Sequence, residues 1–227
     1  RWASRLAPLS NWMAQSAPGR WIAEALLGID SRRTPPAWAA HTLRREFDSN
    51  VASGFSRTNA PVRIFVDTFT NYYNPQVGMA GARVLQAAGL QVGLAPNGCC
   101  GRPMISQGLL AQARAAAEFN TDTLYPLAQS GAQFVFFEPS CLSAMREDVP
   151  SLLRGEAQQR AAAVAAQSVL FEDLLEQQFE RDPLPVTFTP RPGTIVLHGH
   201  CHQKAMGLLP PAKALLSRIP QASVVAL

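Results

Sequence analysis

The sequence has few charged residues and no long apolar run. Charged side chains make up 16% of its 227 residues, against roughly 25% in typical soluble proteins, while hydrophobic residues make up 47%. Disordered chains combine high charge with low hydrophobicity, so this composition excludes disorder for most of the chain. The most apolar stretch, 161–170, is interrupted by Gln167 and Ser168 and falls short of the roughly 18 residues that a membrane helix needs.

The sequence also lacks a strong basic excess and a secretory leader. The formal net charge is only +4, and the scattered bases do not form the stripe of a nucleic-acid-binding protein, so we expect no nucleic-acid partner. Arg1 leads directly into Trp2 and an amphipathic pattern rather than the apolar core of a signal peptide. We therefore expect a cytoplasmic protein, or one bound peripherally at the inner face of the membrane, with no transmembrane segment.

Cysteine is scarce as well. Four cysteines in a chain of this length are too few for a secreted disulfide scaffold. Two of them, Cys99 and Cys100, are neighbours, and neighbouring cysteines rarely bridge each other because the geometry is strained. A reducing compartment is the expectation.

From Pro61 onward, strand and helix patterns alternate. Buried strands are predicted at 62–66, 91–94, 134–137 and from 194 onward, and helices at 77–88, 106–130, 142–153 and 155–182. Strands that alternate with helices predict a parallel sheet covered on both faces, built from Rossmann-like βαβ units. The fold class is therefore α/β.

The first fifty residues differ in composition from the rest. They hold all four tryptophans, Trp2, Trp12, Trp21 and Trp38. Helical spacing over 21–27 followed by Gly28 predicts a helix with a glycine C-cap. We expect a helical linker that follows an upstream domain and packs its aromatic side chains on neighbouring segments.

A shift of 133 residues indicates an internal repeat. It places Thr68 on Cys201 and carries two predicted strands onto later ones, 62–66 onto 195–199 and 91–94 onto 224–227. The expected organisation has four parts: a helical linker at 1–58, a first α/β repeat at 59–155, a helical connector at 156–192, and the start of a truncated second repeat at 193–227.

All four cysteines are predicted to lie in loops after strands. In open α/β sheets, ligands bind at the carboxyl ends of the strands. Gly98 and Gly101 flank the cysteine pair and would let the backbone turn tightly and approach a bulky group. Four cysteines are the usual ligand set of an iron–sulfur cluster, and the helices that follow Cys100 and Cys141 would favour thiolates.

Spacing alone leaves other interpretations open. His198, His200 and His202 surround Cys201, and a mixed set of imidazole and thiolate ligands suits zinc. A thiol–disulfide pair formed by Cys99 and Cys100 is a third interpretation. Glu138 is expected to orient its loop by accepting hydrogen bonds from backbone amides rather than to act as an acid or base.

Three motifs occur in order along the chain: Cys-Cys-Gly at 99–101, Glu-Pro-Ser-Cys at 138–141 and Gly-His-Cys-His-Gln-Lys at 199–204. With them the chain resembles the cysteine-rich CCG domain of iron–sulfur proteins. That family includes the CCG-containing subunit of heterodisulfide reductase and the iron–sulfur subunits of D-lactate, glycolate and glycerol-3-phosphate dehydrogenases. The resemblance is nearest to fused proteins in which an FAD-linked oxidase and a ferredoxin-like segment precede this domain.

The resemblance implies a function for the chain as part of a larger oxidoreductase. It implies an iron–sulfur electron-transfer domain of a flavin-dependent 2-hydroxy acid dehydrogenase, which relays electrons from FAD in an upstream domain to a quinone or carrier. The chain itself would hold no complete active site. The implied partners are the FAD-linked oxidase domain and the ferredoxin-like domain.

The resemblance also implies a ligand set, from which the chain departs at two places. A cluster, expected to be of the 4Fe-4S type, would be held by four cysteines: Cys99, Cys100, Cys141 and Cys201. Thr68 stands at the family's leading cysteine, and Ala144 at the second cysteine of the late motif. One cluster shared between the two repeats is therefore the expectation.

Overall fold

A four-stranded parallel sheet forms the centre of the molecule, as the sequence predicts. The computed structural model describes residues 4, 6–50, 60–181 and 185–227. The strands lie in the order β2-β1-β3-β4, and every neighbouring pair is parallel. Their bounds are β1 Val62–Ile64, β2 Val92–Leu94, β3 Gln133–Phe136 and β4 Ser168–Leu170. The predicted α/β fold is confirmed.

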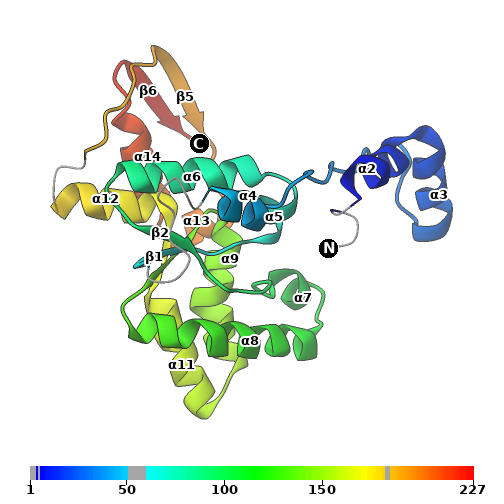
Figure 1. The fold of residues 1–227 in the computed structure, drawn as a ribbon, viewed down its shortest axis with the longest axis horizontal. Helices are drawn as coiled ribbons and strands as arrows, with labels where there is room; N and C mark the ends of the chain where they lie inside the picture. The colour runs from blue at the N-terminus through cyan, green and yellow to red at the C-terminus, as the bar shows by residue number, and fades with distance from the viewer. Residues whose placement is uncertain (1–3, 5, 51–59, 182–184) are drawn as a thin grey trace.

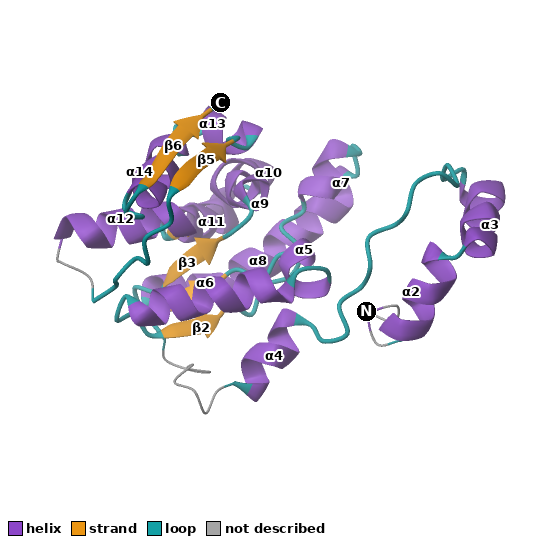
Figure 2. Ribbon diagram, turned by 90° about the horizontal axis from the view of Figure 1, so that it is seen from above, coloured by secondary structure: helices purple, strands orange, loops and turns teal. Residues whose placement is uncertain are grey.

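Helices cover both faces of this sheet (Figures 1 and 2). On one face Phe134 and Phe136 pack with α8 and α11, and on the other Ile64 and Val135 pack with α4, α6 and α12. Alternate residues of a strand point to opposite faces, so β3 packs apolar side chains on both sides of the sheet. The bounds of these helices are α4 Leu43–Ser49, α6 Pro75–Ala87, α8 Leu110–Gln129, α11 Gly155–Ala166 and α12 Phe171–Arg181.

The single helix predicted over 155–182 is wrong, because a strand interrupts it. Helix α11 ends at Ala166, and β4 pairs with β3 before α12 begins at Phe171. Ser168 is buried, and its hydroxyl donates to the carbonyl of Val164 at 2.9 Å. The expected helical connector at 156–192 thus supplies the fourth strand of the first sheet. The alanine-rich pattern suits a helix, and only pairing with β3 makes three of its residues a strand.

Two other predicted helices are divided. The segment predicted at 106–130 is α8, preceded by the short helix α7 Arg102–Ser106. The segment predicted at 142–153 begins earlier and contains a turn of π-helix, so that it reads α9 Pro139–Ser143, η2 Ala144–Asp148 and α10 Val149–Leu152. Single π-helical turns occur frequently at functional sites.

The N-terminal helices form a hairpin that projects away from the sheet (Figure 1). Helix α2 spans Ala7–Gln15, and α3 spans Ala17–Leu27. Gly28 ends α3 with φ of 66° and donates its N–H to carbonyls of the last turn, which confirms the predicted C-cap.

The tryptophans of this region do not share one environment. Trp38 stacks on Tyr73 with ring centroids 4.6 Å apart, as expected of a packed aromatic. Trp12 and Trp21 are instead 69% and 67% exposed, so the prediction that they pack is wrong for both. Trp2 lies outside the described residues.

A second, two-stranded parallel sheet closes the described chain. Strands β5 Gly193–Leu197 and β6 Ala222–Ala226 form this sheet, and helices α13 Cys201–Ala205 and α14 Leu209–Ser217 lie between them in the chain. We call these four elements the second unit. The first unit, residues 60–181, begins with the same order of elements. From β1 to β2 it has a strand, two helices and a strand, with the short helix α5 Thr68–Tyr72 in the place of α13. Helices α5 and α13 each have five residues, and their first residues, Thr68 and Cys201, are related by the predicted shift of 133.

Helix α12 ties the second unit to the first. Gln203 donates to Glu172 at 2.6 Å, and Arg218 makes two hydrogen bonds to Glu176, at 2.6 and 2.8 Å. The Arg218 guanidinium also lies 4.1 Å from the ring centroid of Phe179. These contacts hold α13, with Cys201 at its start, in a defined place beside the first sheet.

Within the part of the chain that the structure describes, no helix has both the length and the apolar character that a membrane crossing requires.

We predict that the packing of α6 is a major source of stability. Leu85 is fully buried, whereas the neighbouring Val84 is 37% exposed. Leu85→Ala should lower the free energy of unfolding by about 2–5 kcal/mol, because it leaves a cavity in the core. Val84→Ala, the control, should change it by less than about 1 kcal/mol. Urea denaturation curves of the two variants measure this, and equal losses would contradict the placement of α6.

Candidate cysteine site

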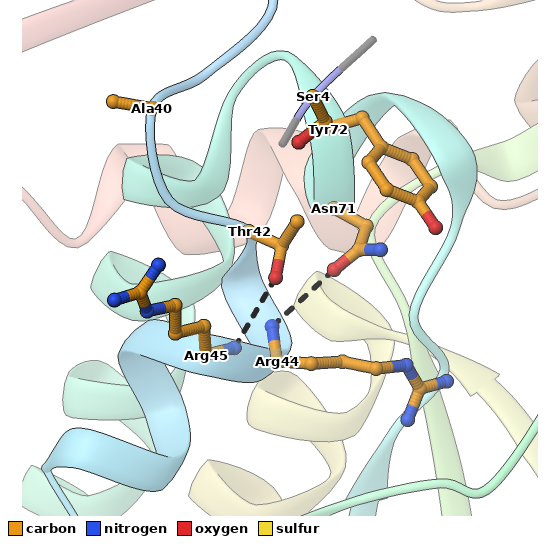
Figure 3. Close-up of a pocket in the computed structure, with 7 residues that line it drawn as sticks. All are labelled: Ser4, Ala40, Thr42, Arg44, Arg45, Asn71 and Tyr72. Atoms are coloured by element: carbon orange, nitrogen blue, oxygen red, sulfur yellow. Dashed lines mark hydrogen bonds between the residues drawn. The ribbon is translucent and has the colours of Figure 1, made fainter. Parts of the chain in front are cut away.

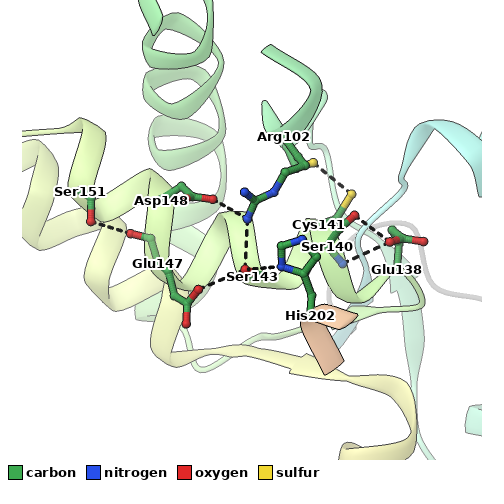
Figure 4. Close-up of polar contacts among 10 residues, drawn as sticks. Arg102, Glu138, Ser140, Cys141, Ser143, Glu147, Asp148, Ser151 and His202 are labelled. Atoms are coloured by element: carbon green, nitrogen blue, oxygen red, sulfur yellow. Dashed lines mark hydrogen bonds and ion pairs between the residues drawn. The ribbon is translucent and has the colours of Figure 1, made fainter. Parts of the chain in front are cut away.

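Three of the four cysteines meet beyond the carboxyl ends of β2 and β3. The sulfur atoms of Cys100 and Cys141 lie 3.0 Å apart, and both residues are buried (Figure 4). Cys99, the neighbour of Cys100 in sequence, is half-buried. All four cysteines are free thiols. The parallel sheet therefore joins segments that are 41 residues apart in sequence. The prediction that all four cysteines lie in loops is confirmed for Cys99 and Cys100 and wrong for Cys141 and Cys201, because α9 contains Cys141 and α13 begins at Cys201.

Two asparagine side chains fix the backbone of the cysteine loop, residues 95–101, which carries Cys99 and Cys100. Asn97 accepts from the N–H of Val66 at 2.9 Å and donates to its carbonyl at 3.0 Å, which fixes the loop to the end of β1. Asn120, fully buried in α8, accepts from Gly98 N–H and donates to the Cys99 carbonyl, both at 2.8 Å. With their backbone partners fixed, the cysteine thiols have defined positions.

Gly98 and Gly101 meet different structural requirements. Gly101 has φ of 88° and precedes α7, in a conformation that a side chain would strain. At Gly98, an added Cβ would lie 3.2 Å from two ring carbons of Phe119. The tight turn thus falls on Gly101, and the close approach at Gly98 is made by Phe119.

The thiols of the pair are held protonated at neutral pH. The hydrogen bond with Cys141, together with burial, raises the pKa of Cys100 to about 12. The hydrogen bond with Cys100, followed by burial, raises the pKa of Cys99. The short helix α7 does not outweigh these effects, although the sequence predicts that the helix after Cys100 favours the thiolate.

The donor atoms suit a thiophilic metal group, but their present spacing is that of thiols in contact. Two thiolates on one tetrahedral ion with bonds of about 2.3 Å would stand about 3.8 Å apart. The 3.0 Å between Cys100 and Cys141 is shorter, and a disulfide would need about 2.05 Å. In residues 4, 6–50, 60–181 and 185–227, no three or more His, Cys, Asp or Glu side chains are grouped so as to hold a metal ion. Binding would require these side chains to rotate apart.

The fourth predicted ligand lies on the neighbouring helix. Cys201 is exposed, with its sulfur 3.8 Å from Nδ1 of His200. His200 and His202 stack with ring centroids 5.6 Å apart, and His198 is exposed after β5. The structure thus brings Cys99, Cys100 and Cys141 together and leaves Cys201 at the start of α13, which contacts α9.

A polar network beside the thiols joins the two units (Figure 4). The Ser143 hydroxyl donates to Glu147 at 3.1 Å and accepts from Arg102 at 3.1 Å. His202 Nδ1 lies 3.1 Å from the same oxygen, so His202 donates there, because the one hydroxyl proton is already used. Arg102 also pairs with Asp148 at 2.6 Å.

Glu138 has the role that the sequence predicts. Its carboxylate accepts from the Ser140 N–H at 3.1 Å and from the Ser140 hydroxyl at 2.7 Å, so it caps α9. The same carboxylate lies 3.8 Å from Nε2 of His200. A residue expected to orient its loop therefore also faces the second unit.

Two hollows lie on the other side of the cysteine loop. The larger, of about 440 Å³, is lined by residues of α4, α5 and the N-terminal segment (Figure 3). The smaller, of about 190 Å³, reaches Cys99. Three residues line both hollows: Arg44, Asn71 and Tyr72. A small molecule can therefore reach Cys99 from the surface through the smaller hollow.

Sequence reasoning missed the residues that hold the loop. Arg44 donates to the carbonyls of Ala95 and Asn97, at 3.0 and 2.9 Å. Asn120 carried one signal, an amide within an otherwise alanine-rich helix. Arg44 carried none, because it lies in a segment that resembles a linker.

The chain is similar to a subunit of the anaerobic glycerol-3-phosphate dehydrogenase of Escherichia coli. The two are 31% identical over 217 residues, which cover 94% of this chain and 53% of that protein, with the same values in two strains. The chain is related to a dehydrogenase subunit. It spans about half the length of these curated relatives.

A second relative supports the same class of protein. A D-2-hydroxyglutarate dehydrogenase of Pseudomonas putida is 28% identical over 138 residues, which cover 61% of this chain and 12% of that protein. No protein-family model matches the chain, so the resemblance to the CCG domain stays a prediction. No solved structure matches it either.

We predict that Asn120 is required for an ordered cysteine loop. Asn120→Ala leaves the Gly98 N–H and the Cys99 carbonyl without their partner, which should cost about 2–4 kcal/mol of unfolding free energy. The Gly98 amide should also exchange its hydrogen faster. Asn74→Ala, at an exposed asparagine, serves as the control. Unchanged exchange at Gly98 in Asn120→Ala would contradict the arrangement.

Proposed function

We propose that the chain is an iron–sulfur electron-transfer domain of a flavin-dependent 2-hydroxy acid dehydrogenase. The observation that carries the proposal is the contact between Cys100, the neighbour of Cys99, and Cys141 beyond the carboxyl ends of a parallel sheet, where α/β folds bind ligands. The relation to a dehydrogenase subunit supports it. FAD would be bound by another part of the parent protein or complex, and the acceptor would be a quinone or carrier.

The cysteines would hold the cluster, which when bound takes up and releases single electrons. Cys99, Cys100 and Cys141 come from the first unit and Cys201 from the second, so the cluster, of 4Fe-4S type, would be shared between them. The network around Ser143 and His202 supports this sharing, because it holds α13 against α9. Arg102 and its partner Asp148 keep the two cysteine loops together.

The proposal includes the organisation of the parent protein. Residues 59–155 form the first CCG-type repeat, 193–227 begin the second, and 1–58 connect to an upstream domain. The partners are the FAD-linked oxidase domain and a ferredoxin-like domain. We place the protein in the cytoplasm, with peripheral binding at the inner face of the membrane as the alternative.

The proposal predicts that iron and sulfide assemble on the chain under anaerobic conditions. Cys100→Ser should lose most of the bound iron and the EPR signal of the reduced protein, because a buried thiolate ligand is removed. In the parent protein, the same change should stop electron delivery to the acceptor while substrate still reduces the flavin. Iron and sulfide counts, EPR and flavin absorbance measure these three outcomes.

Two further variants sharpen this test. Cys201→Ser should also lose iron if the cluster is shared between the units, whereas Ser106→Ala, at an exposed position in α7, should bind as the unchanged protein does. Stoichiometric zinc without iron in the anaerobically purified protein would contradict the proposal and favour a zinc-stabilised structural or docking module.

One observation favours a second candidate function, a thiol–disulfide redox domain. The 3.0 Å contact directs that chemistry to Cys100 and Cys141 rather than to the adjacent pair. The two thiols would lose two electrons and two protons and form one S–S bond. A small-molecule disulfide would take up the electrons and protons and leave as two thiols.

This second candidate makes its own prediction. Oxidised glutathione, added to protein prepared without iron, should produce a Cys100–Cys141 disulfide and leave Cys99 open to alkylation. Peptide mapping by mass spectrometry identifies the bond. Only mixed disulfides with glutathione, or a Cys99–Cys100 bond, would count against this pairing, and Cys141→Ala provides the control in which it cannot form.

A further inference from the structure

The segment before the first sheet is more than a connection, because its helix α4 is part of the core. Leu43 and Phe47 are 0% and 2% exposed and pack with Ile64 and Leu85. Between them, Arg44 is half-buried, and its guanidinium reaches the cysteine loop. Its backbone N–H donates to Asn71 in α5 at 3.3 Å (Figure 3).

The guanidinium of Arg44 binds two backbone carbonyls of the loop that leads to Cys99. Nη1 donates to the Ala95 carbonyl at 3.0 Å, and Nη2 donates to the Asn97 carbonyl at 2.9 Å. Hydrogen bonds from a charged donor are stronger than neutral ones, and the planar fork of arginine fixes direction as well as distance. One residue of α4 therefore sets the path of the backbone two residues before Cys99.

Arg44 also lines both hollows beside the loop. The larger one opens among residues of the N-terminal segment and α5, and the smaller one reaches Cys99. A shorter or less firmly held side chain at this position would join the two spaces and widen the approach to the thiol.

We propose that Arg44 is a positioning residue of the cysteine site, which couples helix α4 to the Cys99–Cys100 loop and limits access to Cys99. This role deepens the proposed function and rests on it: in an electron-transfer domain, a displacement of the N-terminal segment would reach the metal ligands through this side chain. Arg44 touches neither sulfur, so it acts through the loop backbone.

The experiment measures the alkylation rates of Cys99 and Cys201 by iodoacetamide in the full chain prepared without iron. Arg44→Met should raise the rate at Cys99 at least about tenfold, the population change expected when a charged hydrogen bond that holds the loop is lost. The rate at exposed Cys201 should stay the same. Arg44→Lys, which keeps the charge and one donor group, should restore part of the protection.

The adjacent arginine of the same helix is a matched control. Arg45 is exposed and lines the larger hollow but not the smaller one that reaches Cys99. Arg45→Met therefore removes the same charge without touching the loop and should leave both rates within twofold. A rise at Cys99 and Cys201 together in Arg44→Met would indicate general destabilisation and overturn the proposal. An unchanged Cys99 rate would overturn it as well.

A second readout separates this inference from the proposed function. Cobalt(II), which gives thiolate charge-transfer absorption, is titrated into the unchanged chain and into Arg44→Met. Weaker cobalt binding in Arg44→Met alone supports the positioning role, and equal binding contradicts it. If cobalt, iron and zinc all fail to bind the unchanged chain, the proposed cluster is wrong, while the alkylation rates still decide the role of Arg44.

Discussion

The parallel pairing of β1 with both β2 and β3 organises the whole molecule around one edge of the sheet. It brings the loops after these strands to that edge, so Cys99 and Cys100 meet Cys141 across 41 residues of sequence. Parallel strands also require helical crossovers and apolar faces on both sides. The helices that carry Arg44 and Asn120 lie on opposite faces of the sheet, and both reach the same cysteine loop.

The polar side chains around the cysteines position the backbone, a role different from that of the thiols. Asn97, Asn120 and Arg44 satisfy backbone donors and acceptors of one loop, and Glu138 caps the helix that carries Cys141. This leaves the thiols as the reactive groups of the edge. The raised pKa values of Cys99 and Cys100 favour the thiol form, and a bound metal would reverse this by taking the proton's place.

Much of the fold could be predicted because its pattern is local. Three of the four strands of the first sheet and the C-cap at Gly28 follow from periodicity and glycine placement. Strand β4 could not be predicted in this way, since Ser168 to Leu170 continue an apolar helical pattern and become a strand only beside β3. The prediction that Trp12 and Trp21 pack on neighbouring segments is wrong for a different reason. Residue type indicates that a side chain is apolar but does not show that a packing partner lies near it.

Short-range patterns in the sequence establish the α/β class and the placement of Cys99 and Cys100 in a loop after a strand. The repeat with a spacing of 133 residues stays a prediction. These are properties of short segments, so they can be predicted without knowing which residues pack against them. The folded chain alone establishes that Cys100 contacts Cys141, that Cys201 stands on a separate helix, and that Arg44 in an apparent linker holds the cysteine loop. Such contacts depend on distances between segments far apart in the chain, which no local pattern encodes.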